Sequence, residues 1–174
     1  CTFSYFENLK GLNKILVIVP SFLRANWRNE ILKWSDFNEN DIQVLYKTKE
    51  AIHDFTKIIV VSYDIVVRKL SEFEKLKSQI DFVVIDESHY VKNIKSKRCR
   101  AIKKLVKKTK HLMLLSGTPA VNRPSELVSQ LNLINPTVFN DYYQFAERYC
   151  NAYKDHFGYN DRGRSNEKEL NYML

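Results

Sequence analysis

Two adjacent carboxylates, Asp86 and Glu87, directly follow the apolar run Phe-Val-Val-Ile at residues 82–85. A short continuous apolar run predicts a strand that is buried on both faces. Unpaired charges are costly to bury, so we expect the two acids at the strand's end and not inside the core. There, one carboxylate can hold Mg²⁺ through water, and the other can orient and deprotonate an attacking water. This combination suits hydrolysis of a phosphoanhydride, in which catalysis is mostly positioning and charge neutralisation.

Taken alone, an Asp-Glu pair more often begins a solvated loop, so the elements around it decide between the two interpretations. Strands are predicted at residues 15–19, 42–46, 58–61, 82–85 and 112–115. Three helical patterns lie between these strands: one directly after Pro20-Ser21, one from about residue 63 to 77, and one from 95 to 109. Strands of the buried type that alternate with helices indicate an α/β fold, a doubly wound parallel sheet covered by helices in three layers.

Helical patterns dominate the remainder of the chain. We expect helices at 124–134, 142–149 and about 167–173, with a polar loop at 155–164. Ser21 is a suitable N-cap for the first helix. Trp27 and Trp34 recur in that helix at the spacing of a core face, which favours packing over base stacking. We expect no internal domain boundary: residues 1–174 form one partial lobe, and 137–174 form its helical appendage.

Three of the predicted strands end in polar or turn-forming residues. These are Pro20-Ser21, Asp86-Glu87 and Ser116-Gly117-Thr118. In open parallel sheets, ligands bind outside the carboxyl ends of the strands, so these residues would gather along one edge. For Ser116 to Pro119 an ordinary turn is an equally good interpretation, because Gly and Pro mark turns in any case.

Positive charge is concentrated in one stretch of the chain. The net charge is +8, and residues 92–110 contain ten Lys or Arg and no acidic residue. Such a stretch suits a polyanionic partner such as DNA. It equally suits a solvated helix face on which lysine stems cover apolar surface, and both interpretations stay open.

Three cysteines at wide spacings form no zinc pattern and no disulfide framework, which predicts an intracellular, reducing location. No apolar run approaches 18 residues, so no membrane span is expected, and no signal peptide is visible. The first residue is Cys and not Met, which suggests a piece of a longer chain.

Four motifs in order resemble those of Swi/Snf-type superfamily-two helicase-like ATPases. Asp86-Glu87-Ser88-His89 is similar to motif II, a DEAH-like Walker B element, and Ser116-Gly117-Thr118-Pro119 is similar to motif III. Val19-Pro20-Ser21 is similar to motif Ia, and Val61-Ser62-Tyr63-Asp64 stands where motif Ib falls. Each motif is weak alone, whereas four in this order and at these spacings are specific.

The resemblance extends to the annealing-helicase, fork-remodelling branch of that family, and covers essentially the whole chain. It is carried by the following segments of the second half: Arg123-Pro124-Ser125-Glu126-Leu127, Pro136, Phe139, Phe145, Arg148-Tyr149-Cys150, Gly163, Ser165-Asn166 and Glu169-Leu170. The resemblance implies a RecA-like P-loop NTPase lobe that uses ATP and Mg²⁺. It also implies that the parent protein translocates on DNA or rewinds it, and that this DNA is branched, forked or contains a junction between single and double strand. In a eukaryote, the resemblance implies a nuclear location.

The resemblance also assigns roles to residues. Asp86 would hold Mg²⁺ through water, Glu87 would be the catalytic base, and His89 would communicate with motif III. Coupling between nucleotide and DNA would fall to Ser116, Gly117 and Thr118. DNA contacts would fall to Pro20, Ser21, Ser62, Tyr63, Lys92 and Asn93.

One part of the family pattern does not occur in this sequence: the phosphate cradle Gly-x-Gly-Lys-Thr/Ser. We therefore expect a lobe truncated before its Walker A segment, inactive alone, that works with a second RecA-like lobe of the same parent chain. Without the strand that enters the cradle, the strand at 112–115 would have an exposed edge open to self-association. The alternative is a non-catalytic DNA-binding or scaffold module.

Overall fold

The computed structural model describes residues 13–107, 109–117, 123–156 and 158–173. The chain divides into two compact units, which are described separately. The first comprises the described parts of residues 1–87 and 100–115, and the second comprises those of 88–99 and 116–174. The expected organisation as one lobe with a helical appendage stays a prediction.

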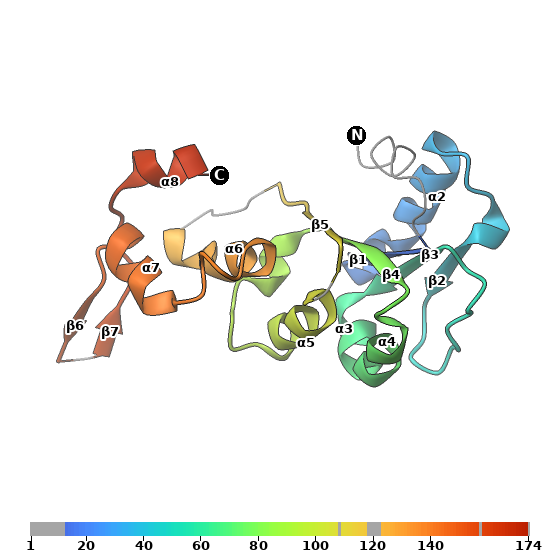
Figure 1. The fold of residues 1–174 in the computed structure, drawn as a ribbon, viewed down its shortest axis with the longest axis horizontal. Helices are drawn as coiled ribbons and strands as arrows, with labels where there is room; N and C mark the ends of the chain where they lie inside the picture. Colours follow the sequence, from blue (N-terminus) through green and yellow to red (C-terminus); the bar gives the residue numbers. More distant parts are fainter. Residues whose placement is uncertain (1–12, 108, 118–122, 157, 174) are drawn as a thin grey trace. The chain divides into compact units, whose positions relative to one another are not determined.

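The first unit is built on a five-stranded parallel sheet with the order β2-β3-β1-β4-β5 (Figure 1). Its strands are β1 (Lys14–Val19), β2 (Ile42–Leu45), β3 (Ile58–Ser62), β4 (Ile80–Ile85) and β5 (His111–Leu114). Val17 in the central strand β1 pairs with Val60 on one side and Val84 on the other. All five predicted strands are therefore confirmed, with ends that differ by at most a few residues.

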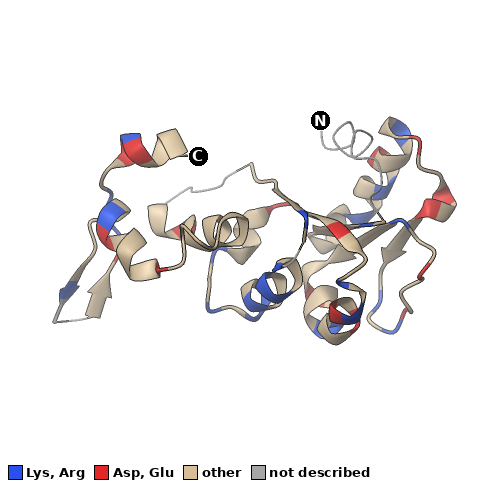
Figure 2. Cartoon of the chain, viewed as in Figure 1, with Lys and Arg blue, Asp and Glu red and all other residues tan. Residues whose placement is uncertain are grey.

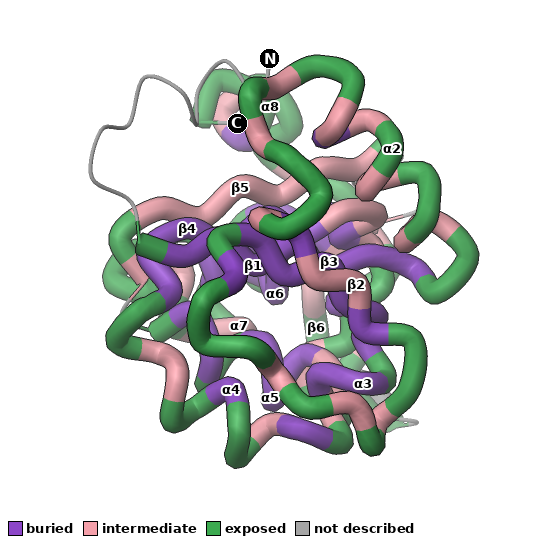
Figure 3. The backbone as a smooth tube through the Cα atoms, turned by 90° about the vertical axis from the view of Figure 1, so that its right-hand side faces the viewer, coloured by how far each residue is buried: buried purple, intermediate pink, exposed green. Residues whose placement is uncertain are grey.

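The sheet's core follows from its sequence of consecutive apolar residues. Every residue of β1, β3 and β4 is buried, whereas β5 is half-buried along its length (Figure 3). Side chains alternate between the two faces of a strand. One face of the sheet packs Val17, Val60 and Val84 with Ile31 of α2 (Arg24–Trp34). Helices α3 (Tyr63–Arg68) and α4 (Leu70–Leu76) cover the other face (Figure 1), which confirms the three-layer α/β architecture.

Two expectations for the first helix are wrong. A 3-10 turn, η1 (Ser21–Leu23), precedes α2, and Ser21 caps neither of them with its side chain, because the chain bends at Pro20 before the helix begins. Trp34 is 62% exposed and its indole Nε1 donates to Glu30 Oε2 at 2.8 Å, so it is not a core residue. Trp27 does pack against the core, as predicted.

The helix predicted at 63–77 is divided at Lys69. That residue is 4% exposed, and its ammonium donates to Thr48 O at 3.0 Å and pairs with Glu72 at 2.7 Å. Lys69 adopts a non-helical conformation with ψ of 22°. The buried charge thus finds its partners at the break between α3 and α4.

Another buried lysine anchors the amino end of β1. Lys14 is 2% exposed, and its Nζ donates to the carbonyl oxygens of His53, Asp54 and Thr56 at 3.3, 2.9 and 2.8 Å. Burial lowers the pKa of Lys14, and the nearby charge of Asp54 offsets part of that effect. Three carbonyl acceptors satisfy the three donors of an ammonium group, so Lys14 ties the 53–56 loop to the sheet.

The basic stretch forms α5 (Lys97–Val106) and its flanks. Cys99, Ile102 and Leu105 are buried on one side of this helix, and lysines and arginines lie along its remaining surface (Figure 2). The end of the stretch is paired: Lys110 contacts Asp81 at 2.7 Å. Lys108 lies outside the described residues.

The second unit is mostly helical. It contains η3 (Ser88–Val91), η4 (Pro124–Glu126), α6 (Val128–Ile134), α7 (Tyr142–Tyr149) and α8 (Glu167–Met173). Leu131, Phe145 and Leu170 belong to its core. Asp141 caps α7 by accepting the Tyr143 N–H at 2.8 Å. The polar segment expected to be a loop contains part of a hairpin, β6 (Tyr153–Asp155) and β7 (Gly158–Asn160), which its lack of apolar alternation concealed. The short η2 (Glu39–Asp41) of the first unit was also not predicted.

Among the helices of the described residues, none combines the length and the apolar character that a membrane crossing requires.

Candidate functional site

Asp86 and Glu87 stand where β4 reaches the carboxyl edge of the sheet, between β1 and β5. The Asp86 N–H donates to Ile18 O at 2.9 Å, which extends the pairing of β4 with β1 by one residue. The Asp86 carboxylate receives two hydrogen bonds, from the Trp27 indole Nε1 to Oδ2 at 2.7 Å and from the Glu87 N–H to Oδ1 at 2.8 Å. Each carboxylate oxygen can accept more than one hydrogen bond. The group is therefore oriented and still able to accept from a ligand or water.

Glu87 adopts a left-handed backbone conformation, with φ of +50°. A residue with a Cβ is uncommon in this region, and such outliers cost on the order of 1–3 kcal/mol. The strained turn directs the chain away from the strand immediately after Asp86. Backbone outliers of this kind cluster at functional sites, which makes Glu87 a candidate for a functional side chain.

Tyr63 braces the same turn from α3. Its hydroxyl donates to Asp86 O at 2.6 Å and lies 3.3 Å from Glu87 O. Tyr63 is 2% exposed and Ser62 is 5% exposed. This burial leaves their side chains little surface for a DNA contact, and the role the resemblance gives them stays a prediction. What the geometry shows is a support for the backbone of the two acids.

Pro20 and Ser21 follow β1 at the same edge, because Val19 pairs with Ser62 and Ile18 pairs with Ile85. Pro20 is buried and Ser21 is exposed. The Ser21 carbonyl accepts the Arg24 Nε–H at 2.9 Å. Six of the predicted site residues thus gather at one edge of the first unit: Pro20, Ser21, Ser62, Tyr63, Asp86 and Glu87.

The remaining predicted site residues belong to the second unit. Ser88 Oγ donates to Gln130 Oε1 at 2.6 Å, and Ser129 Oγ donates to Val91 O at 2.7 Å, so two buried bonds fix η3 to α6. The His89 ring lies 4.9 Å from that of Tyr90. The structure therefore anchors the segment that follows the acids at both of its ends.

Lys92 and Asn93 continue from η3. Lys92 Nζ pairs with Glu126 at 3.0 Å, and Asn93 Oδ1 accepts the Lys95 N–H at 2.9 Å. Ser116 is half-buried and Gly117 is exposed. Thr118 lies outside the described residues, so its predicted coupling role is not addressed by the structure.

Sequence reasoning missed the hydrogen bonds that Trp27 and Gln130 make to Asp86 and Ser88. Trp27 was predicted as a packing residue. Its indole N–H can donate to Asp86 only because α2 packs on the sheet, which the sequence alone does not show. Gln130 is 5% exposed within a helix, and its polar side chain in an apolar segment was the available signal.

The fold and the edge geometry define a class first: an α/β lobe with a five-stranded parallel sheet in which strand β4 is followed by two adjacent acids. The SNF2-related domain family matches residues 3–174, and the chain belongs to this family. The SWI2/SNF2 ATPase core of Sulfolobus solfataricus in complex with dsDNA superposes with a TM-score of 0.70 and 28% identity, covering 84% of this chain and 30% of that one.

Two curated relatives are similar over most of this chain. "SWI/SNF-related matrix-associated actin-dependent regulator of chromatin subfamily A-like protein 1" of Bos taurus is 41% identical over 162 residues. "DNA annealing helicase and endonuclease ZRANB3" of Homo sapiens is 34% identical over 168 residues. Each alignment covers 92% of this chain but only 17% and 16% of the respective relative. The predicted Swi/Snf membership is confirmed, and annealing helicases are among the relatives.

Proposed function

We propose that this chain is part of the first RecA-like lobe of a DNA-dependent ATPase that couples ATP hydrolysis to translocation on, or rewinding of, DNA. The observation that carries the proposal is the Asp86 carboxylate, which the Trp27 N–H and the Glu87 N–H orient at the carboxyl end of β4. The left-handed backbone of Glu87, the next residue in the chain, adds to it, because backbone outliers of this kind cluster at functional sites.

The described residues suit a magnesium ion held mainly by its own waters. They contain no group of three or more His, Cys, Asp or Glu side chains that could enclose a metal ion. Mg²⁺ keeps several waters and commonly takes one or two carboxylates together with the phosphates of a nucleotide. Asp86 fits that task, since both of its oxygens are oriented and each can accept further hydrogen bonds. When bound, the ion neutralises phosphate charge.

In this proposal Glu87 orients and deprotonates the water that attacks the γ-phosphate. His89 communicates with the Ser116 segment, and Ser116, Gly117 and Thr118 couple the nucleotide state to the grip on DNA. Pro20, Ser21, Ser62, Tyr63, Lys92 and Asn93 contribute to the DNA path, for Ser62 and Tyr63 through their backbone, because their side chains are buried.

DNA as the partner is supported by two similar proteins: the Sulfolobus solfataricus ATPase core is in complex with dsDNA, and the human relative is a DNA annealing helicase and endonuclease. We propose that branched, forked or junction DNA is the substrate and that a eukaryotic parent is nuclear. A phosphate cradle and a second lobe would come from the same parent protein. Among the described residues, the half-buried edge strand β5 pairs only with β4. The strand that leads into the cradle would pair with its other edge, or a second copy of this chain would pair there instead.

The first experiment is to sequence the gene on both sides of the Cys1 codon. An in-frame Gly-x-Gly-Lys-Thr/Ser before that codon supports the ATPase. The full-length protein is then assayed for DNA-stimulated ATP hydrolysis as wild type, Glu87→Gln and the exposed-helix control Glu74→Gln. We expect Glu87→Gln to lower kcat at least a hundredfold and Glu74→Gln to leave it within twofold.

A start codon directly before Cys1 would favour the alternative, a non-catalytic DNA-binding or scaffold module. Equal activity of Glu87→Gln and wild type would remove Glu87 from the mechanism. The 174-residue chain by itself should hydrolyse no ATP at a useful rate, because its sequence contains no phosphate cradle. Turnover by this chain that Glu87→Gln abolishes would contradict that expectation.

A further inference from the structure

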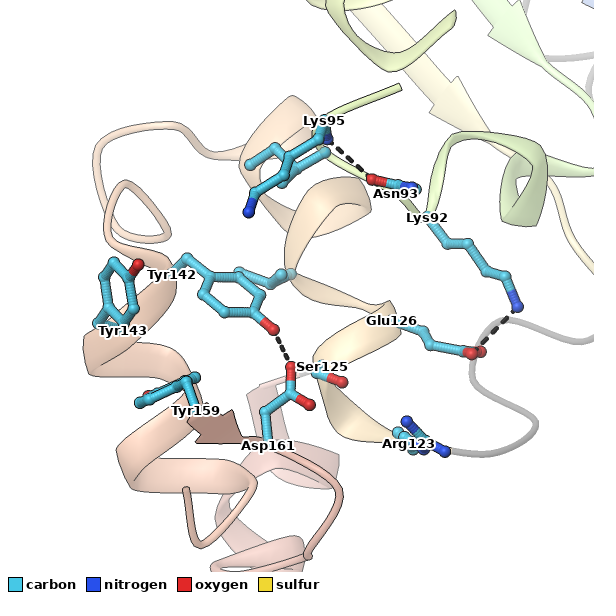
Figure 4. A pocket seen from close by; sticks show the side chains of 12 residues that line it. Lys92, Asn93, Lys95, Arg123, Ser125, Glu126, Tyr142, Tyr143, Tyr159 and Asp161 are labelled. Atoms are coloured by element: carbon cyan, nitrogen blue, oxygen red, sulfur yellow. Dashed lines mark hydrogen bonds and ion pairs between the residues drawn. The ribbon is translucent and has the colours of Figure 1, made fainter. Parts of the chain in front are cut away.

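A pocket of about 620 Å³ opens in the second unit and is lined by residues of that unit alone (Figure 4). It is bounded by the 92–95 segment, by η4, by α7 and by the end of the β6–β7 hairpin. This volume lies within the range of pockets that accept small organic ligands. The pocket therefore has room for a ligand larger than an ion.

Tyrosines form one side of this pocket. Tyr142 and Tyr143 come from α7 and Tyr159 comes from β7 (Figure 4). The ring centroids of Tyr143 and Tyr159 are 5.2 Å apart in a T-shaped arrangement. Tyr143 is 61% exposed and Tyr159 is 37% exposed, so both present open ring surface. Two exposed rings in this arrangement form a platform on which a flat group can stack on one ring and meet the other edge to face.

Tyr142 secures the hairpin to the helix. Its hydroxyl donates to Asp161 Oδ2. Burial, together with the hydrogen bond to Asp161 and its negative charge, raises the pKa of Tyr142 well above its usual value. Tyr142 therefore stays a protonated donor at physiological pH, and the platform next to it is held in place.

The charges around the pocket leave two cations available. Lys92 and Glu126 neutralise each other across 3.0 Å, and Asp161 is engaged by Tyr142. For Lys95 and Arg123, neither side chain has an ion pair with any residue that the structure describes. Figure 4 shows them at opposite ends of the pocket, with the tyrosines along one side. Phosphate groups can approach these two cations while a ring occupies the space between them.

We propose that this pocket binds one unpaired nucleotide of a DNA strand. The base stacks on the face of one of the two rings, Tyr143 or Tyr159, and meets the other ring edge to face. The phosphates on either side of the base contact Lys95 and Arg123. Sites for single-stranded nucleic acid combine aromatic stacking with cations in this way. An acidic peptide would use the cations but gain little from the exposed ring faces. The proposal deepens the proposed function and rests on DNA being the partner.

The test measures DNA binding without ATP, so its outcome does not depend on hydrolysis. The full-length protein is titrated into a fluorescein-labelled 12-nucleotide single strand and into a labelled blunt 20-base-pair duplex. Tyr143→Ala combined with Tyr159→Ala should weaken single-strand affinity at least tenfold, because each stacked base contributes substantially. Duplex affinity should change less than twofold. Tyr172→Ala, which removes a 93% exposed tyrosine of α8 outside the pocket, should affect neither.

Two further variants separate stacking from a fold defect and from bulk charge. Tyr143→Phe with Tyr159→Phe keeps the rings and should retain wild-type affinity. Lys95→Glu should flatten the salt dependence of single-strand binding by about one phosphate contact, whereas Lys168→Glu on α8 should change it less.

Three results would overturn the proposal. The first is unchanged single-strand affinity in the double alanine variant, and the second is an equal loss of affinity for the single strand and the duplex. The third is competition by a poly-glutamate peptide whose binding depends on Lys95 and Arg123 but not on the tyrosines.

Discussion

Trp27 Nε1 donates a hydrogen bond of 2.7 Å to Asp86 Oδ2, although 59 residues separate the two in sequence. The bond joins the first helix after β1 to the carboxyl end of β4. In the proposed mechanism, Trp27, which is partly buried against the core, would position the acid that holds Mg²⁺ through water.

Trp27→Phe keeps an aromatic ring in the core and removes this bond. A hydrogen bond to a charged group contributes about 1.5–3 kcal/mol, so we expect kcat of the full-length protein to fall about tenfold. The Mg²⁺ concentration for half-maximal activity should rise, which a purely structural defect would not produce. Trp34→Phe, at an exposed tryptophan, is the control. Identical Mg²⁺ titrations for the two variants would contradict the positioning role.

Glu87→Gly tests the strain at φ of +50°. Glycine adopts this conformation without a Cβ penalty, so relief of strain should exceed the entropic cost of glycine and raise the free energy of unfolding by about 1 kcal/mol. The same substitution at Glu74, in the ordinary helical conformation of α4, should lower it by about 1 kcal/mol. Urea unfolding of the 174-residue chain measures both. A loss at Glu87 as large as that at Glu74 would mean the turn stores no strain.

Charge reversal on the basic helix decides between its two interpretations. Lys103, Lys104 and Lys107 are exposed, and each that contacts a phosphate contributes about one unit to the salt slope of duplex binding. We expect the triple Glu variant of the full-length protein to bind duplex more weakly and with a flatter slope. Reversal of Lys49, Lys154 and Lys168 changes the net charge equally and serves as the control. Equal slopes in the two variants would assign the helix face to solvation.

Asp81 gives a pH dependence of stability. Burial alone would raise its pKa, but hydrogen bonds from Asn13 and the ammonium group of Lys110 outweigh burial and hold the pKa below its usual value. Because the pKa of Asp81 is lower in the folded state than in the unfolded state, its ionised carboxylate stabilises the fold at pH values above the unfolded pKa of about 3.9. This contribution is lost as the pH falls through the folded pKa.

Asp81→Asn should therefore lower the free energy of unfolding at pH 7 by about 1.5–3 kcal/mol. The difference from wild type should shrink as the pH is lowered below about 4. Denaturant unfolding of the chain at pH 7, 5 and 3 measures this, with the exposed Asp36→Asn as the control. A difference that stays constant down to pH 3 would exclude the carboxylate's ionisation as its source.

The strands could be predicted because continuous apolar runs bounded by polar residues leave few alternatives. The failures have different causes. Trp34 has core spacing but lies beyond the edge of the packed face, and the break at Lys69 exists because Thr48 O lies within reach of its ammonium. The hairpin at β6 and β7 lacks an apolar pattern altogether.

The position of the two acids at the end of β4 could also be predicted, because unpaired charges are costly to bury inside a strand. What orients them could not be predicted. The indole of Trp27, the hydroxyl of Tyr63 and the amide of Gln130 are ordinary residues in sequence, and only the packing of helices on strands brings their donors and acceptors to the backbone and side chains around Asp86 and Ser88.

Lys14, with its ammonium enclosed by three carbonyls, has a consequence for chemical footprinting. An amine-reactive reagent needs access to the nitrogen, and the folded chain offers none at this position, because Lys14 is buried and its Nζ is enclosed by three carbonyl oxygens. Modification of Lys14 would therefore report opening of the loop at 53–56 or of β1 itself. Exposed lysines such as Lys47 would react throughout and calibrate the measurement. A single peptide signal at Lys14 would thus record how often the amino end of the central strand comes apart.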